Sequence, residues 1–451
     1  MARSRRAALP PLPSMLNART LIAAFVFPIA LGAQTTLDKR ETALRGEVAK
    51  RRDDQILYLE KLVNIPSGTL NVTGVREVGR VIGATLDSMG FKSQWVEVPR
   101  DMKRAGHLVS THVGKAGTPR ILLIGHLDTV FEGPNQRFER VDTIAKGAGS
   151  NDIKGGDVIM IYALKAMQAA GTLKDLNVTI VMTGDEEYPG EPLSVARAAL
   201  TDAAKQTDLA LAFEGGSRTQ ATIGRRSASG WVLKVGGQQG HSGGVFRSGY
   251  GAIYEAARIL DEFRRELANE KDLTYNPGTI AGGSNVTYDS LTQSGTVASK
   301  TNIIAPITWV QGDLRAMDPA QIVRAQTKMK EIVARHLKGT TAEISFAEGY
   351  PPMAVTPGGE KLLSFYSDAS AALGYGALKA SDPALRGAGD LSFVAPFIDG
   401  VEGLGALGSG AHSPNESVNL PALTMQTERA AVMLYRLSKE KAENVRRTPK
   451  M

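Results

Sequence analysis

Between about residues 121 and 216 the chain alternates short apolar runs with helix-length segments, and this alternation limits its possible folds more than any other feature. The apolar runs have the length of β-strands, and the longer segments carry apolar residues at helical spacing. The predicted strands are 121–130 ("ILLIGHLDTV"), 176–187 and 208–216, and the predicted helices between them are 155–171 and 193–206. Strands that alternate with helices form a parallel sheet covered on both faces. The sequence therefore predicts an α/β domain with a mainly parallel sheet.

The pattern changes from about Ser227, where short alternating runs and two amphipathic helices replace the earlier units. Asp318 and Pro319 predict the N-cap and the first turn of the second of these helices. From about Ala347 the α/β pattern resumes and continues to a final helix. We therefore expect a small α+β domain at 227–346, inserted between the two parts of a larger domain at 38–226 and 347–445.

Residues 1–33 have the pattern of a secretory signal peptide. Four arginines precede the apolar run "TLIAAFVFPIALGA", which ends in small residues and is too short to span a bilayer comfortably. A retained membrane anchor is the alternative. Residues 1–33 contain four arginines and no acidic residue, so their removal lowers the formal charge from +7 to +3. A charge of this size does not favour binding to nucleic acid. We expect an exported, periplasmic protein with no stable membrane association after cleavage of the signal.

The chain contains no cysteine and only six histidines. Disulfides and thiolate metal ligands are thereby excluded, so any metal site must be built from histidine and carboxylates. The sequence also lacks GxxxxGK[ST] and HExxH motifs, which are the usual signatures of P-loop nucleotide hydrolases and zincins.

Residues able to bind metal follow the apolar runs of the larger domain. In open parallel sheets, ligands gather at the carboxyl ends of the strands, so these distant residues are expected to converge. Taken singly, each has an ordinary explanation, such as a hydrogen-bonded His-Asp pair, an acidic helix start or an exposed loop histidine. Their recurrence at successive strand ends favours a pair of divalent ions that share one carboxylate. The candidates are His126, Asp128, Asp152, Glu186, Glu187, Glu214 and His412.

Two of these motifs suggest a division of roles. His126 and Asp128 alternate along one strand and share a face, so Asp128 can hold the second ring nitrogen of a metal-bound His126. The adjacent Glu186 and Glu187 can divide the work, because one can bind metal while the other remains free as a general base.

In order and spacing these motifs resemble the dinuclear zinc metallopeptidase family of glutamate carboxypeptidase, aminoacylase and succinyl-diaminopimelate desuccinylase. The resemblance runs from about Asp53 to Leu437 and looks closest to the glutamate carboxypeptidase branch. It implies a bridging Asp152, Glu186 as general base and Asp128 as the residue that orients a ligand. It also implies two Zn²⁺ per subunit, for which Co²⁺ or Mn²⁺ can substitute, bound by His126, Asp152, Glu187, Glu214 and His412.

The inserted domain carries the second part of the resemblance. "GQQGHSGG" is similar to the family's lid motif, which implies that His241 stabilises the oxyanion, often from the partner subunit of a homodimer. "TNIIAP" and "GDLR" similarly imply that Asn302 and Arg315 bind the substrate. An ordinary turn histidine and a strand-end salt bridge are the alternatives for His241 and Arg315.

Other residues match the family less well. "GAGD", which ends at Asp390, occupies the place of a glycine-rich active-site loop. Ile153 replaces the second acid that follows Asp152 in many members, and Tyr350 replaces the arginine typical of glutamate-releasing members. The remaining histidines match no motif and are interpreted as structural or surface residues; they are His107, His112 and His336.

The sequence thus predicts a zinc-dependent carboxypeptidase that releases a C-terminal amino acid, with glutamate as one candidate, from small peptides or N-acyl amino acids. An aminoacylase or a dipeptidase of the same family remains an alternative. A metal-dependent peptide-binding protein without catalytic activity is the alternative from a different class.

Overall fold

The computed structural model describes residues 36–133, 137–289 and 294–447. The predicted signal peptide, residues 1–33, lies outside this part of the chain. Among the helices in the described ranges, none is both long enough and apolar enough to cross a membrane.

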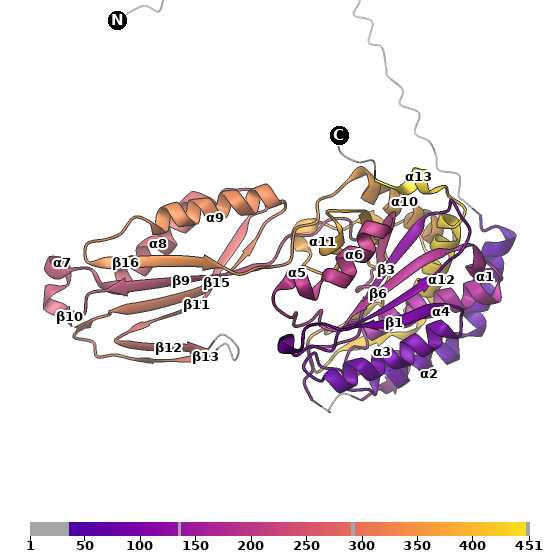
Figure 1. The fold of residues 1–451 in the computed structure, drawn as a ribbon, viewed down its shortest axis with the longest axis horizontal. Coiled ribbons are helices and arrows are strands. Elements are labelled where there is room, and N and C mark those ends of the chain that lie inside the picture. Colours follow the sequence, from indigo (N-terminus) through magenta and orange to yellow (C-terminus); the bar gives the residue numbers. More distant parts are fainter. Residues whose placement is uncertain (1–35, 134–136, 290–293, 448–451) are drawn as a thin grey trace, which may run out of the picture. The chain divides into compact units, whose positions relative to one another are not determined.

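The larger domain is built on a six-stranded sheet with the strand order β1-β2-β6-β3-β7-β18 (Figure 1). The central strand β3 pairs in parallel with β6 and β7, and β7 pairs in parallel with β18, whereas β1 and β2 form an antiparallel edge. The prediction of a mainly parallel sheet is confirmed. The strands are β1 (Lys92–Val96), β2 (His107–His112), β3 (Arg120–His126), β6 (Asn177–Thr183), β7 (Leu209–Ala212) and β18 (Asp399–Glu402).

Helices cover both faces of this sheet, which explains why its strands are apolar at successive positions. Ile121 and Leu123 of β3 belong to the large core formed with one group of helices, while Leu122 and Ile124 belong to a smaller core on the other face. A strand buried on both sides has no solvent face and needs no polar alternation. The first group is α1 (Lys39–Lys50), α2 (Arg52–Val63), α3 (Val72–Asp87), α4 (Lys154–Ala169), α10 (Pro357–Ala372) and α12 (Leu420–Leu437), and the second contains α6 (Ala198–Gln206) and α11 (Leu391–Val394) (Figure 1).

The helix predicted at 193–206 is divided in two. Residues Leu193–Ala196 form α5, and α6 begins at Ala198. Arg197 lies between them and is buried, with its guanidinium paired to two aspartates of the larger domain. The amphipathic pattern could not reveal this break, because it depends on residues distant in the sequence.

A second sheet contains four antiparallel strands in the order β11-β15-β9-β16, and all of its elements lie between Ser229 and Phe346. Helices α8 (Gly251–Leu267) and α9 (Pro319–Val333) pack on it and enclose a separate apolar core around Trp231 and Phe263. Asp318 caps α9 as predicted, since its carboxylate accepts the N–H of Gln321 at 2.8 Å. The strands are β9 (Ser229–Gly237), β11 (Thr274–Gly283), β15 (Ile307–Arg315) and β16 (Thr340–Phe346).

Two paired segments connect the inserted sheet to the larger domain. Ala228 and Tyr350 exchange both backbone hydrogen bonds, at 2.8 and 3.1 Å, and Arg225 and Met353 do the same at 2.9 and 3.0 Å. The outgoing and returning chains therefore run side by side as a short antiparallel connector, here defined as residues 225–228 and 350–353.

A small antiparallel sheet brings two distant loops together beside the main sheet. β5 (Ile144–Lys146) pairs with β20 (Ser417–Asn419), so the loop that precedes α4 meets the loop that contains His412. This pairing places Asp152 and His412 in the same region of the fold.

Candidate metal centre

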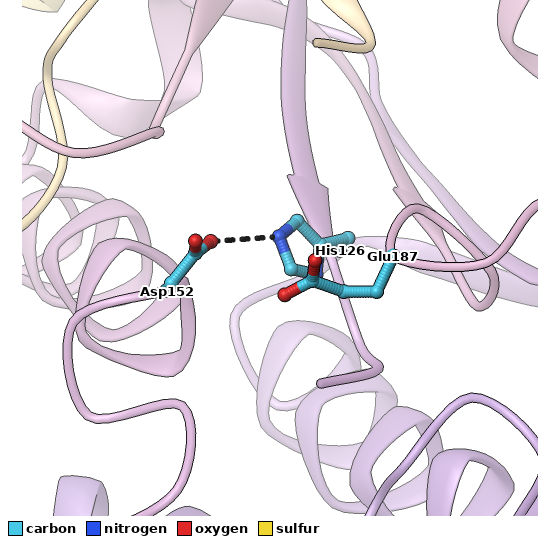
Figure 2. Close-up of side chains that lie close together, drawn as sticks. All are labelled: His126, Asp152 and Glu187. Carbon is cyan, nitrogen blue, oxygen red and sulfur yellow. Dashed lines mark hydrogen bonds and ion pairs between the residues drawn. The ribbon is translucent and has the colours of Figure 1, made fainter. Parts of the chain in front are cut away.

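Three predicted ligands point toward one another at the carboxyl edge of the main sheet (Figure 2). His126 is the last residue of β3, Asp152 precedes α4, and Glu187 follows β6. Their nearest ligand atoms all lie within 4.8 Å of one another. The predicted convergence at strand ends thus holds for these three side chains.

Asp152 stands between the two histidines. Its Oδ1 lies 3.2 Å from Nε2 of His126, and its Oδ2 lies 3.1 Å from Nε2 of His412. Glu214 Oε1 is 3.6 Å from His126 Nε2, while Glu187 Oε2 is 3.1 Å from His412 Nε2. The side chains therefore form two donor groups that share Asp152.

These spacings fit donor atoms arranged around metal ions. Zinc bonds to imidazole nitrogen and carboxylate oxygen are about 2.0–2.2 Å long, so tetrahedral geometry separates neighbouring donors by about 3.3–3.6 Å. The four distances above span 3.1–3.6 Å, whereas direct charge-assisted hydrogen bonds are usually about 2.7–2.9 Å. In addition, the buried Oε1 of Glu187 has no hydrogen-bond partner within the described residues.

The crowding of carboxylates is visible in the protonation equilibria of the cluster. Burial, together with the neighbouring Asp152, raises the pKa of Glu214 to about 7. Interactions with the nearby carboxylates of Asp152 and Glu187 raise the pKa of His412 to about 10. Such a group of mutually repelling acids is stabilised by added positive charge, which a divalent cation supplies.

Asp128 contacts the turn that contains Glu186 and Glu187, here called the acidic turn, as well as the imidazole of His126. Its Oδ1 and Oδ2 accept the backbone N–H groups of Glu186 and Glu187 at 3.0 and 3.1 Å, and Oδ2 also accepts the hydroxyl of Thr69 at 2.6 Å. The Nδ1 of His126 lies 3.1 Å from the backbone oxygen of Asp128 and 3.4 Å from its carboxylate. The predicted contact between the two side chains therefore exists, and the main-chain contact is the shorter one.

Glu186 is partly buried beside the ligands, and burial raises the pKa of its carboxyl well above the usual value. Its backbone carbonyl accepts the hydroxyl of Tyr350 at 2.8 Å. Raising the pKa of a carboxylate makes it a stronger base for proton transfer.

Several supporting residues had no signal in the sequence because they act on the backbone or on one another. Glu416 is buried and accepts the N–H groups of Gly149, Asn151 and Asp152 at 2.8–3.1 Å. Lys154 donates to the carbonyl of Ile65 at 2.8 Å, and burial lowers its pKa to about 7.

Asp390, for which the sequence predicts no specific contact, forms an ion pair and a hydrogen bond in the structure. Its Oδ1 lies 2.7 Å from Nε of Arg197, and its Oδ2 accepts the hydroxyl of Thr183 at 2.6 Å. Arg197 also donates to Asp185 Oδ1 at 2.6 Å. Arg197 thereby links the glycine-rich loop at Asp390 to Asp185, the residue before Glu186. The peptide bond between Asp152 and Ile153 is cis.

The three predicted lid residues divide into two groups. His241 pairs with Ile303, which places it beside Asn302, and both are exposed. Arg315 ends β15 next to the connector, whereas the opposite end of β15, Ile307, pairs with Gly236 near His241. Eight residue steps of strand separate these ends by about 27 Å. Nε of Arg315 lies 2.8 Å from Asp313, which is the predicted alternative of a strand-end ion pair.

Across the described ranges, no hydrogen bond or ion pair joins these lid residues to the metal-binding cluster. The remaining histidines also lie apart from the ligand atoms. His107 is buried and accepts the N–H of Gly184 at 3.2 Å, His112 contacts the Leu176 carbonyl at 2.8 Å, and His336 lies 3.7 Å from Glu255.

Comparison with known proteins identifies the type of fold. Residues 122–437 match the model of "Peptidase family M20/M25/M40". The chain is 26% identical over 437 residues to carboxypeptidase G2 of Pseudomonas sp. (strain RS-16), with 93% of this chain and 98% of that protein covered. It is 25% identical over 312 residues to succinyl-diaminopimelate desuccinylase of Delftia acidovorans, with 66% and 77% covered.

Solved structures share the same architecture. Aminopeptidase PepT of Bacillus cereus superimposes with a TM-score of 0.68 at 17% identity, over 86% of this chain and 99% of that one. The M20 family metallo-carboxypeptidase Sso-CP2 of Sulfolobus solfataricus gives 0.62 at 15% identity, over 85% and 99%. At these identities the likeness concerns the fold alone.

Proposed function

We propose that this chain, which belongs to peptidase family M20/M25/M40, is a dinuclear carboxypeptidase that releases a C-terminal amino acid from small peptides or N-acyl amino acids. The observation that carries the proposal is Asp152, whose two oxygens face His126 and His412 with Glu186 close by. The match to carboxypeptidase G2 over nearly its whole length supports release from the C-terminal side.

The donor set would hold two ions. His126 and Glu214 would complete one site and His412 and Glu187 the other, with Asp152 shared between them. Imidazole and carboxylate donors suit zinc, with Co²⁺ or Mn²⁺ as substitutes. When bound, the ions would supply Lewis-acid polarisation of the scissile carbonyl.

Glu186 would transfer the proton in this reaction. Glu186 would accept a proton from the attacking water as the new C–O bond forms at the amide carbon. It would then deliver that proton to the amine nitrogen as the C–N bond breaks, while the second water proton stays on the new carboxyl group and is released to solvent. The products are a carboxylate and the free amino acid. The raised pKa of Glu186 fits a group that must both accept and donate a proton.

We propose that the active form is a homodimer in which His241 and Asn302 serve the site of the partner copy. Their position at the end of β15 opposite to Arg315 supports this division, because Arg315 lies next to the connector of its own chain. Exposed apolar side chains of the inserted domain offer a surface for a second copy. This lid patch consists of Phe246, Ile253, Tyr254, Ile280 and Val297.

In such a dimer, His241 would donate to the developing oxyanion, and Arg315 would exchange Asp313 for the carboxylate of the substrate. Arginine suits this second task because its planar fork can bind a carboxylate with two parallel hydrogen bonds. Export through the signal at 1–33 belongs to the same proposal, and N-terminal sequencing of the protein recovered from the periplasm tests it.

The proposal is tested by measuring amino-acid release from a panel of N-acyl amino acids and dipeptides with free or amidated C-termini. The assay is run before and after a chelator, and again after zinc is restored. We expect release from free C-termini only, lost with the chelator and recovered with zinc. Release from amidated substrates, or release that survives complete metal removal, would contradict the proposed reaction.

A further inference from the structure

Tyr350 joins the peptide of the proposed general base to the connector between the two sheets. Its hydroxyl donates to the backbone carbonyl of Glu186 at 2.8 Å and accepts from Nη2 of Arg197 at 3.1 Å. Its backbone N–H and carbonyl are both bonded to Ala228 of the connector. The side chain therefore spans from the connector to the acidic turn, and its hydroxyl proton is already used within the protein.

The acidic turn is held from two sides. On the amide side, the Asp128 carboxylate accepts the N–H groups of Glu186 and Glu187. On the carbonyl side, Tyr350 donates to Glu186. These contacts restrain both ends of the Glu186 residue, which leaves its side chain as the freer part.

The Tyr350 ring is itself held in place. It packs edge-on against Phe393, with ring centroids 4.8 Å apart, and the Arg197 guanidinium lies 5.9 Å from its centroid. Arg197 is fixed by ion pairs to Asp185 and Asp390 at 2.6 and 2.7 Å. A hydroxyl on so constrained a ring can define the position of the carbonyl that it contacts.

We propose that Tyr350 is a positioning residue that fixes the Glu186 peptide, and with it the direction of the base, relative to the connector. This inference rests on the proposed function, in which Glu186 transfers the proton. It also assigns Tyr350 a role other than binding the substrate carboxylate. Displacement of a catalytic group by even about 1 Å can cost roughly 100-fold in rate.

The test replaces the hydroxyl and keeps the ring. Tyr350→Phe is compared with Tyr366→Phe, a matched control whose buried hydroxyl contacts Gln426 and Gly403 in the same domain. For Tyr350→Phe we expect kcat to fall about 10- to 100-fold with KM and metal content within about twofold of wild type. The control is expected to keep wild-type kcat.

A purely structural or substrate-binding role would give other results. A rise in KM at unchanged kcat would show that Tyr350 binds substrate, and unchanged kcat and KM would show that its hydroxyl is dispensable. Either result would overturn the inference. A fall in kcat matched by an equal loss of bound metal would do the same, because the ligands rather than the base would then have moved.

A second measurement does not depend on activity. Hydrogen exchange of the peptides that cover residues 184–190 is compared between wild type, Tyr350→Phe and Tyr366→Phe. We expect faster exchange there only in Tyr350→Phe, because the turn loses its carbonyl-side restraint. Unchanged exchange overturns the inference even if the wild-type enzyme releases nothing from the substrate panel, an outcome that contradicts the proposed function alone.

Discussion

The backbone N–H of Asp152 donates to the buried carboxylate of Glu416 at 2.9 Å. The residue that would bridge two ions is thus oriented through its main chain by an acid that does not touch either ion site. Glu416 also accepts from Gly149 and Asn151, so a single side chain organises the whole loop before α4.

Replacing Glu416 by Gln should disturb this loop without removing a ligand. The amide NH₂ would face backbone N–H donors, which leaves buried donors without partners and costs about 1–3 kcal/mol. We expect metal affinity to fall roughly 10- to 100-fold, as is typical for residues that orient metal ligands. Titration of the metal-free protein with zinc measures this. Glu428→Gln, at a buried acid bonded to Tyr375, is the matched control, and equal affinities in both variants would contradict the prediction.

Glu186→Gln should abolish turnover while metal remains bound. The amide keeps the size of the side chain but cannot accept the proton from water, so kcat should fall at least about 100-fold. Activity assays combined with metal analysis test this, with Glu191→Gln at an exposed acid as the control. Near-normal turnover in Glu186→Gln would show that another group is the base.

His412→Ala should reduce the metal content from about two ions per chain to about one, because one donor group loses its nitrogen ligand while the other is intact. His412 Nε2 lies 3.1 Å from both Asp152 and Glu187, whereas His126 and Glu214 do not depend on it. Elemental analysis after dialysis measures the ratio, and His336→Ala in the inserted domain serves as control. Full occupancy in His412→Ala would remove this residue from the ligand set.

Asp208 provides a pH-dependent contribution to stability far from the metal centre. Burial raises the pKa of its carboxyl, but hydrogen bonds from Arg120 and Arg446 outweigh burial and hold the pKa below its usual value. A carboxyl with a lowered folded-state pKa stabilises the fold above its unfolded value of about 3.9, and this stabilisation is lost as the pH falls through the folded value.

The variant Asp208→Asn does not titrate at this position. The difference in unfolding free energy between wild type and Asp208→Asn should therefore be largest above about pH 5 and should shrink toward about pH 3. Urea denaturation of both proteins across this range tests the sign. A difference that stays constant would mean that the charge of Asp208 is not what stabilises the fold.

The proposed dimer depends on the lid patch. Replacing Phe246 and Tyr254 by Ser removes two exposed aromatic side chains whose rings lie 6.0 Å apart, and should leave the fold of the chain intact. We expect light scattering to show a shift from dimer to monomer, with loss of activity if His241 acts across the interface. A wild-type monomer at micromolar concentration would contradict the dimer.

The sequence was informative where a residue's role depends on its own chemistry. The family match confirms the resemblance and the enzyme class that were inferred from the motifs around His126, Asp152 and Glu187. The mainly parallel sheet was predictable because each strand carries its own apolar run. The metal, the substrate and the roles of the lid residues remain predictions.

Residues whose role depends on distant partners were not predictable. Arg197 interrupts a helical pattern to pair with Asp185 and Asp390, which are far from each other in the sequence. Glu416 binds backbone groups, which all residues share, so its target has no sequence signal. Tyr350 shows a departure from the family pattern, but only the fold reveals that it contacts Glu186.

The pairing of Ala228 with Tyr350 also bears on how such a protein can diversify. A segment whose two ends lie side by side can be lengthened, shortened or exchanged without stretching the scaffold that carries it. In this sense the inserted domain can be exchanged while the larger domain and its metal-binding residues are kept. New substrate ranges can arise by remodelling the inserted domain, while the six-stranded sheet continues to present the same acids and histidines.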